Sequence, residues 1–135
     1  MLAPSEALPE RSLGEVLPGP FRAAFLSGTT ALVVSGSSVT AYDATTGAPG
    51  SRRPLPPGST VTGFQGGILV YTRQASVHVL RLADGRDRTV ATAPGLVDAQ
   101  LGSLGLFYGY NVPRGGAKPG RVAFVPAGTL TKLLG

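Results

Sequence analysis

The sequence predicts an all-β chain of about three similar antiparallel units, each with four short strands. A Pro-Gly pair recurs at Pro18, Pro57 and Pro94, at spacings of 39 and 37 residues. The 135 residues include 20 Gly and 12 Pro, a content rich in turns, while 42% are apolar, which is enough for a folded core. Between the turns, residues alternate with the period of two that is typical of β-strands.

Each unit repeats the same order of segments. After these three Pro-Gly pairs come a β-prone run, a Gly break and a more apolar run, namely FRAAFLSGTTALVVSG, STVTGFQGGILVYTR and LVDAQLGSLGLFYGYN. A further run ending in a Gly turn follows, namely SVTAYDATTG, SVHVLRLADG and GRVAFVPAG. Runs such as ALVVSG and ILVYT are apolar on both faces, which suits strands inside a stack of sheets. We place the units at 19–56, 58–93 and 95–135, together forming one partial repeat domain over 19–135.

Residues 1–18 are expected to form an N-terminal tail ending in RSLGEVLP (11–18), the outer strand left over from a preceding unit. The first twenty residues have neither a basic start nor a long apolar run, so they do not resemble a secretory signal. Eighteen consecutive apolar residues occur nowhere, so no membrane-spanning helix is expected. Helical spacing competes with the strand pattern only at the two ends of the chain, in PSEALPERSLGEVL and TLTKLLG.

The acidic residues near the Gly turns are interpreted as turn-forming groups. Asp43 and Asp84 are expected to occupy equivalent positions ahead of Gly47 and Gly85, where a carboxylate accepts hydrogen bonds from nearby backbone N–H groups. Asp84 and Gly85 are further expected to form a type I′ hairpin turn, because both residue types tolerate positive φ.

The composition excludes most catalytic chemistries. The absence of Cys excludes thiolates, disulfides and Cys-based metal sites, and one His is too few for an imidazole metal cage. That residue, His78, shares a strand face with Leu80 and Leu82, opposite Val77 and Val79, and is expected to pack between units because no nucleophile motif accompanies it. No catalytic, cofactor-binding or metal-binding residue is predicted, and the chain is not expected to be an enzyme.

The net charge of +5 does not predict nucleic-acid binding. The basic residues are scattered along the chain, with only Arg52 and Arg53 adjacent, and no stretch interleaves them densely with aromatic residues. They are interpreted as an arginine-rich solvated surface. Binding to an anionic surface is a weaker alternative that would use this excess of arginine.

Four short antiparallel strands per unit at a period near forty are typical of a β-propeller blade. AYDATTG (41–47) resembles the strand and turn of quinoprotein-type repeats, and VHVLRLADGRDRTVATAPG (77–95) resembles the outer strands of TolB-like blades. The chain is therefore similar to β-propeller repeat proteins of the quinoprotein-like, TolB-like and WD40-like group, although it lacks Trp and hence the Trp-Asp dipeptide. The resemblance implies about three antiparallel four-stranded blades in an open, incomplete propeller, and it carries over no functional residue.

Three blades are too few for a closed ring, because propellers typically have 4–8 blades. Each blade is covered only by its neighbours, so an array of three leaves two apolar end faces. We expect the chain to be a piece, the C-terminal one, of a longer propeller whose remaining blades are its partners. The second alternative is self-assembly of two copies into six blades.

The most distinctive stretch is LGLFYGYNVPRGGAKPGR (104–121), where aromatic residues precede a long cationic loop. Aromatic residues together with arginine are typical of the energetic centres of protein interfaces. The predicted partner-binding residues are Tyr108, Tyr110, Arg114, Lys118 and Arg121. In the alternative interpretation, Phe107 and one tyrosine fill the core of the blade while the loop is a solvated insertion.

The function expected from these patterns is that of a non-catalytic interaction or scaffold module. Its binding surface would be the loops at one rim, with the loop at 111–121 as the first candidate. The competing hypothesis is a fragment of a propeller enzyme whose catalytic residues lie outside this chain. Such an enzyme would be a quinoprotein-like oxidoreductase or a lactonase-like or glycan-processing hydrolase.

Overall fold

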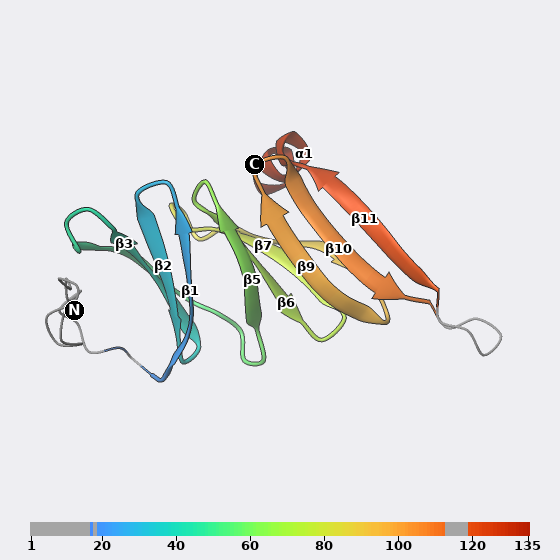
Figure 1. Cartoon of the computed structure of the whole chain (residues 1–135), viewed down its shortest axis with the longest axis horizontal. Coiled ribbons are helices and arrows are strands. Elements are labelled where there is room, and N and C mark those ends of the chain that lie inside the picture. The colour runs from blue at the N-terminus through green and yellow to red at the C-terminus, as the bar shows by residue number, and fades with distance from the viewer. Residues whose placement is uncertain (1–16, 18, 113–118) are drawn as a thin grey trace, which may run out of the picture.

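The computed structural model describes residues 17, 19–112 and 119–135, which form three antiparallel β-sheets in a row (Figure 1). Sheet 1 runs in the order β1 (Phe21–Ser27), β2 (Thr30–Ser35), β3 (Ser38–Asp43) and β4 (Pro49–Pro54). Sheet 2 runs in the order β5 (Thr60–Gln65), β6 (Ile68–Arg73), β7 (Ser76–Arg81) and β8 (Asp87–Thr92). Sheet 3 has the strands β9 (Leu96–Gly102), β10 (Gly105–Asn111) and β11 (Gly120–Pro126), followed by the helix α1 (Ala127–Leu134). The predicted all-β class is therefore confirmed.

The expectation of four strands in the third unit is wrong. Where the first two units form a fourth strand, residues 127–134 form α1, whose Leu130 and Leu134 are buried one helical turn apart. These two leucines belong to the same apolar cluster as Val79 of sheet 2 and Leu106 of sheet 3. The helix thus buries its one apolar face between the two sheets. A strand would instead point successive residues to its two opposite sides. The predicted leftover strand at 11–18 lies outside the described residues except for Leu17.

The middle sheet is buried on both faces, as the runs that are apolar on both sides predict. One face of sheet 2 packs on sheet 1 and the opposite face packs on sheet 3. The side facing sheet 1 contributes, among others, Leu69, Tyr71 and Leu80. The side facing sheet 3 contributes Val70, Val77 and Val79.

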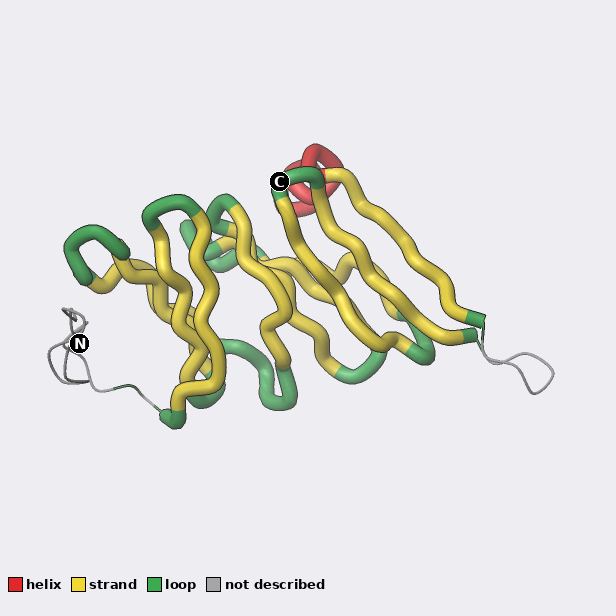
Figure 2. The backbone as a smooth tube through the Cα atoms, viewed as in Figure 1, coloured by secondary structure: helices red, strands yellow, loops and turns green. Residues whose placement is uncertain are grey.

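The first strands of the three sheets are neighbours in space. β1 contacts β5, and β5 contacts β9, although the two strands of each pair belong to consecutive units of the sequence (Figure 2). Gly63 in β5 allows the second contact, because a Cβ at this position would lie 2.9 Å from Cβ of Leu101 in β9. The chain therefore forms a stack of sheets whose first strands run side by side.

Arginine side chains bridge the two gaps between the sheets. Arg53 of β4 donates from Nε to the carbonyl of Leu82 at 3.0 Å and from Nη2 to that of Ala83 at 3.1 Å. Across the second gap, Arg81 donates to the carbonyl of Gly135 at 3.1 Å, and Arg86 donates to that of Leu134 at 2.9 Å. Part of the arginine excess is therefore used inside the fold, which corrects the expectation of a merely solvated surface.

The hairpin turns follow the repeat, but not every turn has the predicted type. Gly66 and Gly67 have φ values of 57° and 80°, the two positive angles that a type I′ turn requires. The type I′ turn expected at Asp84 and Gly85 is wrong, because of these two only Gly85 has positive φ. The loop there is longer, and the N–H of Gly85 donates to the carbonyl of Arg81 at 2.8 Å.

The turn between the second and third strands requires positive φ in both complete sheets. Gly36 in sheet 1 has φ of 55°, and Gln74 at the matching position of sheet 2 has φ of 56°. Gln74 is the only non-glycine residue with positive φ in the part of the chain that the structure describes. An L-residue with a Cβ is disfavoured in this conformation, so the turn of sheet 2 carries a small strain that glycine avoids in sheet 1.

Candidate functional site

Three of the predicted partner-binding residues lie together on one face of sheet 3. Tyr108 and Tyr110 alternate along β10, and their ring centroids are 6.1 Å apart. Arg121 of β11 is paired directly with Tyr110, so its side chain starts on the same face. Arg114 and Lys118 lie outside the described residues. We call Tyr108, Tyr110 and Arg121 the rim cluster, because they lie toward the β10–β11 connection.

The rim cluster is partly anchored in the core. Tyr108 is half-buried and packs against the apolar cluster between sheets 2 and 3, whereas Arg121 is exposed. The cluster therefore has a fixed aromatic base and one free cation, a combination that suits contact with a polar or acidic protein surface.

Phe107 does not fill the core, which corrects the alternative interpretation of this stretch. Its side chain points to the opposite side of β10 from Tyr108 and is 46% exposed. It packs on Phe124 of β11, with ring centroids 4.6 Å apart. Of the two tyrosines in this stretch, Tyr108 packs against the apolar cluster between sheets 2 and 3 but is only partly buried.

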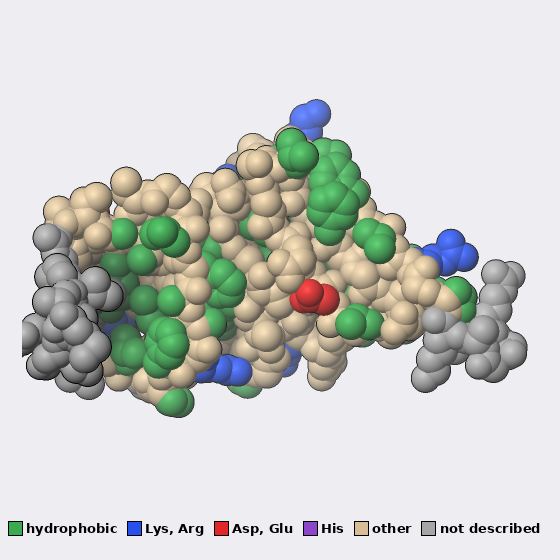
Figure 3. Space-filling view, viewed as in Figure 1, with side chains coloured by type: hydrophobic (Ala, Val, Ile, Leu, Met, Phe, Trp, Pro, Cys, Tyr) green, Lys and Arg blue, Asp and Glu red, His purple; other side chains and the backbone are tan. Residues whose placement is uncertain are grey.

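Sheet 3 has an apolar face that was not predicted from the sequence. Phe107, Val122 and Phe124 all lie on the side turned away from sheet 2, and Leu104 in the β9–β10 turn is also exposed. A hollow of about 330 Å³ lined by residues 100–105 and Phe107 lies beside them. Figure 3 shows hydrophobic side chains gathered over the part of sheet 3 near α1. The alternation in GRVAFVP was the signal for this face, because it places Val122 and Phe124 on the same side.

His78 packs within sheet 2, whereas the sequence predicted packing between units. Its ring stacks on Tyr71 with centroids 4.8 Å apart and an interplanar angle of 11°, and its Nδ1 lies 3.2 Å from the hydroxyl of Thr89. Burial lowers the pKa of His78 below its ordinary value. The hydroxyl of Tyr71 donates to the carboxylate of Asp87, and burial together with this bond raises the pKa of Tyr71 far above its usual range. These four side chains form a stacked and hydrogen-bonded group within sheet 2.

Asp43 and Asp84 both hold turns, which confirms their predicted role, but their positions are not equivalent. Asp43 ends β3 and accepts from both the N–H and the hydroxyl of Thr45, and these bonds lower its pKa. Asp84 lies inside the β7–β8 loop, where it pairs with Arg81 at 2.7 Å and accepts from the N–H of Arg86 at 3.1 Å. Arg81 is the largest cause of the lowered pKa of Asp84.

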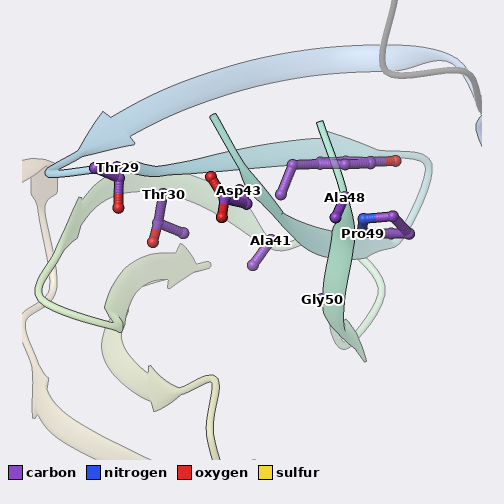
Figure 4. Close-up of a pocket in the computed structure, with 8 residues that line it drawn as sticks. Thr29, Thr30, Ala41, Asp43, Ala48, Pro49 and Gly50 are labelled. Carbon is purple, nitrogen blue, oxygen red and sulfur yellow. The ribbon is translucent and has the colours of Figure 1, made fainter. Parts of the chain in front are cut away.

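A second hollow, of about 270 Å³, lies at the end of sheet 1 that includes Thr29 and Asp43 (Figure 4). Its main charged group is Asp43, whose carboxylate already bonds Thr45 within the turn. Ala41, Ala48 and Pro49 form much of the rest of its lining. This hollow therefore offers a ligand no positioned pair of reactive groups.

The described residues contain no group of three or more His, Cys, Asp or Glu that is arranged to hold a metal ion. The helix in this part of the chain has eight residues, and it is neither long nor apolar enough to cross a membrane. No protein-family model, no curated protein and no solved structure matches this sequence or fold.

Proposed function

We propose that this chain is a non-catalytic protein-interaction module whose three sheets are blades of an incomplete β-propeller. One observation carries the proposal. In the described part of the chain, every large apolar side chain with high exposure belongs to sheet 1, sheet 3 or α1, and none belongs to sheet 2. A stack that buries both faces of its middle sheet and leaves apolar residues at its ends is built for further protein contacts.

The arrangement of the strands supports the propeller assignment. Sheets 1 and 2 share the strand order, and their paired residues repeat at an interval of 38 residues, as in Leu32 with Ala41 and Val70 with Val79. The first strands lie side by side, which is how blades surround a common axis. Remaining blades, or another protein, would then continue the stack.

Within this proposal, the rim cluster is the recognition surface. Tyr110 combines a large ring with a polar tip, and Arg121 lies opposite it with an exposed guanidinium. Such residues dominate binding energy at protein interfaces, whereas the bridging arginines Arg53, Arg81 and Arg86 already bond backbone carbonyls. This distribution favours a protein partner over a general anionic surface.

The test is a capture experiment followed by quantitative binding. Proteins retained by the immobilised chain are identified and purified, and their affinity is measured by calorimetry for the original chain, Tyr110→Ser and Arg121→Ser. We expect each substitution to weaken binding by about tenfold or more. Lys132→Ser removes a cation from α1 instead and is the matched control, with unchanged affinity. The proposal fails if no protein is retained, or if neither rim substitution changes the affinity.

A further inference from the structure

The outer face of sheet 3, defined by Phe107, Val122 and Phe124, repeats positions that are buried in the other two sheets. The cross-strand pair Phe107 and Phe124 corresponds to Leu32 and Ala41 in sheet 1 and to Val70 and Val79 in sheet 2. Val122 likewise corresponds to Val39 and Val77. In sheets 1 and 2, these positions lie in the clusters that each sheet buries against the next one.

In sheet 3 the same positions face solvent. Phe107, Phe124 and Val122 are 46%, 44% and 75% exposed, whereas Leu32, Val70 and Val79 are fully buried. The side chains are also larger, since phenylalanine stands where sheets 1 and 2 have Leu32, Ala41 or valine. Removing apolar area from water is favourable in proportion to that area, so a cover over the exposed parts of both rings stabilises this face. The outer face of sheet 3 therefore carries larger side chains than the interfaces between the sheets.

The chemistry of the outer face favours an apolar partner. Among the outward positions of β9, β10 and β11 that the structure describes, the one charged residue is Asp98. Its carboxylate accepts from the side chain of Gln100 at 2.9 Å and from the N–H of Ala99 at 2.8 Å. No lysine or arginine occupies these outward positions, so an acidic partner or a nucleic acid would find no complementary charge there.

The face also combines a projection with a depression. The packed rings of Phe107 and Phe124 are exposed, and the hollow lined by residues 100–105 and Phe107 lies next to them. A surface with both features can pair with an identical surface, because a two-fold axis brings the rings of each copy over the hollow of the other. Two-fold dimers of this kind are the commonest oligomers of soluble proteins.

We propose that a second copy of this chain covers the outer face of sheet 3, through the same face and around a two-fold axis. A head-to-tail stack, with sheet 3 of one copy on sheet 1 of another, fits less well. On the corresponding side of sheet 1, Val33 and Tyr42 are already buried, and only β1 presents exposed apolar residues there, namely Phe21 and Leu26. The inference rests on the proposed interaction function and adds a second surface to it, on the side of sheet 3 opposite the rim cluster.

The test measures the molar mass of the chain by analytical ultracentrifugation across a range of concentrations. We expect a dimer with twice the mass of one chain. Phe124→Glu and, separately, Val122→Glu should raise the dimer dissociation constant by about a hundredfold or more, because each places two carboxylates in one apolar contact. Within one chain Val122 is 75% and Phe124 44% exposed, so the substituted chains should fold. Circular dichroism spectra with unchanged strand content would confirm this, whereas the thermal midpoint should fall because the dimer no longer stabilises the folded chain.

Leu26→Glu is the matched control, because Leu26 is 69% exposed on the opposite end of the stack. It should leave the dimer intact. A monomeric original chain overturns the proposal, as does a dimer that survives Phe124→Glu and Val122→Glu. Loss of the dimer on Leu26→Glu overturns it too, because only head-to-tail stacking uses that face. A monomer that still binds a captured protein through the rim cluster would reject the dimer and leave the interaction function in place.

Discussion

The helix α1 is expected to be an integral part of the fold, and Leu130→Ala tests this directly. Leu130 is 2% exposed and packs in the cluster between sheets 2 and 3. The substitution removes three carbons from a buried site, which costs roughly 2–3 kcal/mol in transfer free energy. The cavity that remains raises the expected loss to about 3–4 kcal/mol, within the range known for buried leucines.

The measurement is urea unfolding followed by circular dichroism, with Leu133→Ala as the matched control on the same helix. A slope of about 2 kcal/mol per molar urea converts the expected loss into a fall of the midpoint by about 1.5–2 M. Leu133 is exposed, so its substitution should cost less than about 0.5 kcal/mol. Equal midpoints for the two variants would show that α1 does not pack between the sheets, and would refute the reasoning.

Three other substitutions test the contacts and turns of the stack. Gly63→Ala should destabilise the chain by about 1–3 kcal/mol in urea unfolding, because the added Cβ would lie 3.1 Å from the backbone nitrogen of Leu101. A neutral result would mean that β5 and β9 are farther apart. Gln74→Gly should stabilise it by about 0.5–1 kcal/mol, since Gly36 already serves the matching turn, and a lower melting temperature would contradict the positive φ. The folded-state pKa of Asp84 lies below its ordinary 3.8, so its contribution is present above about pH 4 and is lost as the pH falls through the folded-state pKa. Asp84→Asn should therefore reduce stability at pH 6 more than at pH 2, and equal losses at the two pH values would disprove that role.

Strand positions were predictable because the repeat and the alternation are local properties of the sequence. The apolar runs ALVVSG and ILVYT predicted strands buried on both sides, and β2 and β6 have this form. The turn-forming role of Asp43 was equally predictable, since its partner Thr45 lies two residues away. Interactions of this range depend little on the rest of the chain.

The candidate site was predictable only in part. Alternation along β10 shows that Phe107 and Tyr108 point in opposite directions, but it does not show which direction leads to another sheet. The packing of sheet 3 on sheet 2 decided this, partly burying Tyr108 and leaving Phe107 exposed. The pairing of Arg121 with Tyr110 likewise depends on the register between β10 and β11.

The sequence by itself determined the strand class, the period and most turn positions, because glycine, proline and alternating residues act over a few neighbours. The tertiary structure decided that residues 127–134 form a helix. A helix of eight residues is not stable alone, and this one forms because Leu130 and Leu134 are buried between two sheets. It also decided which faces stay uncovered. That outcome depends on how whole sheets pack, and no local pattern encodes it.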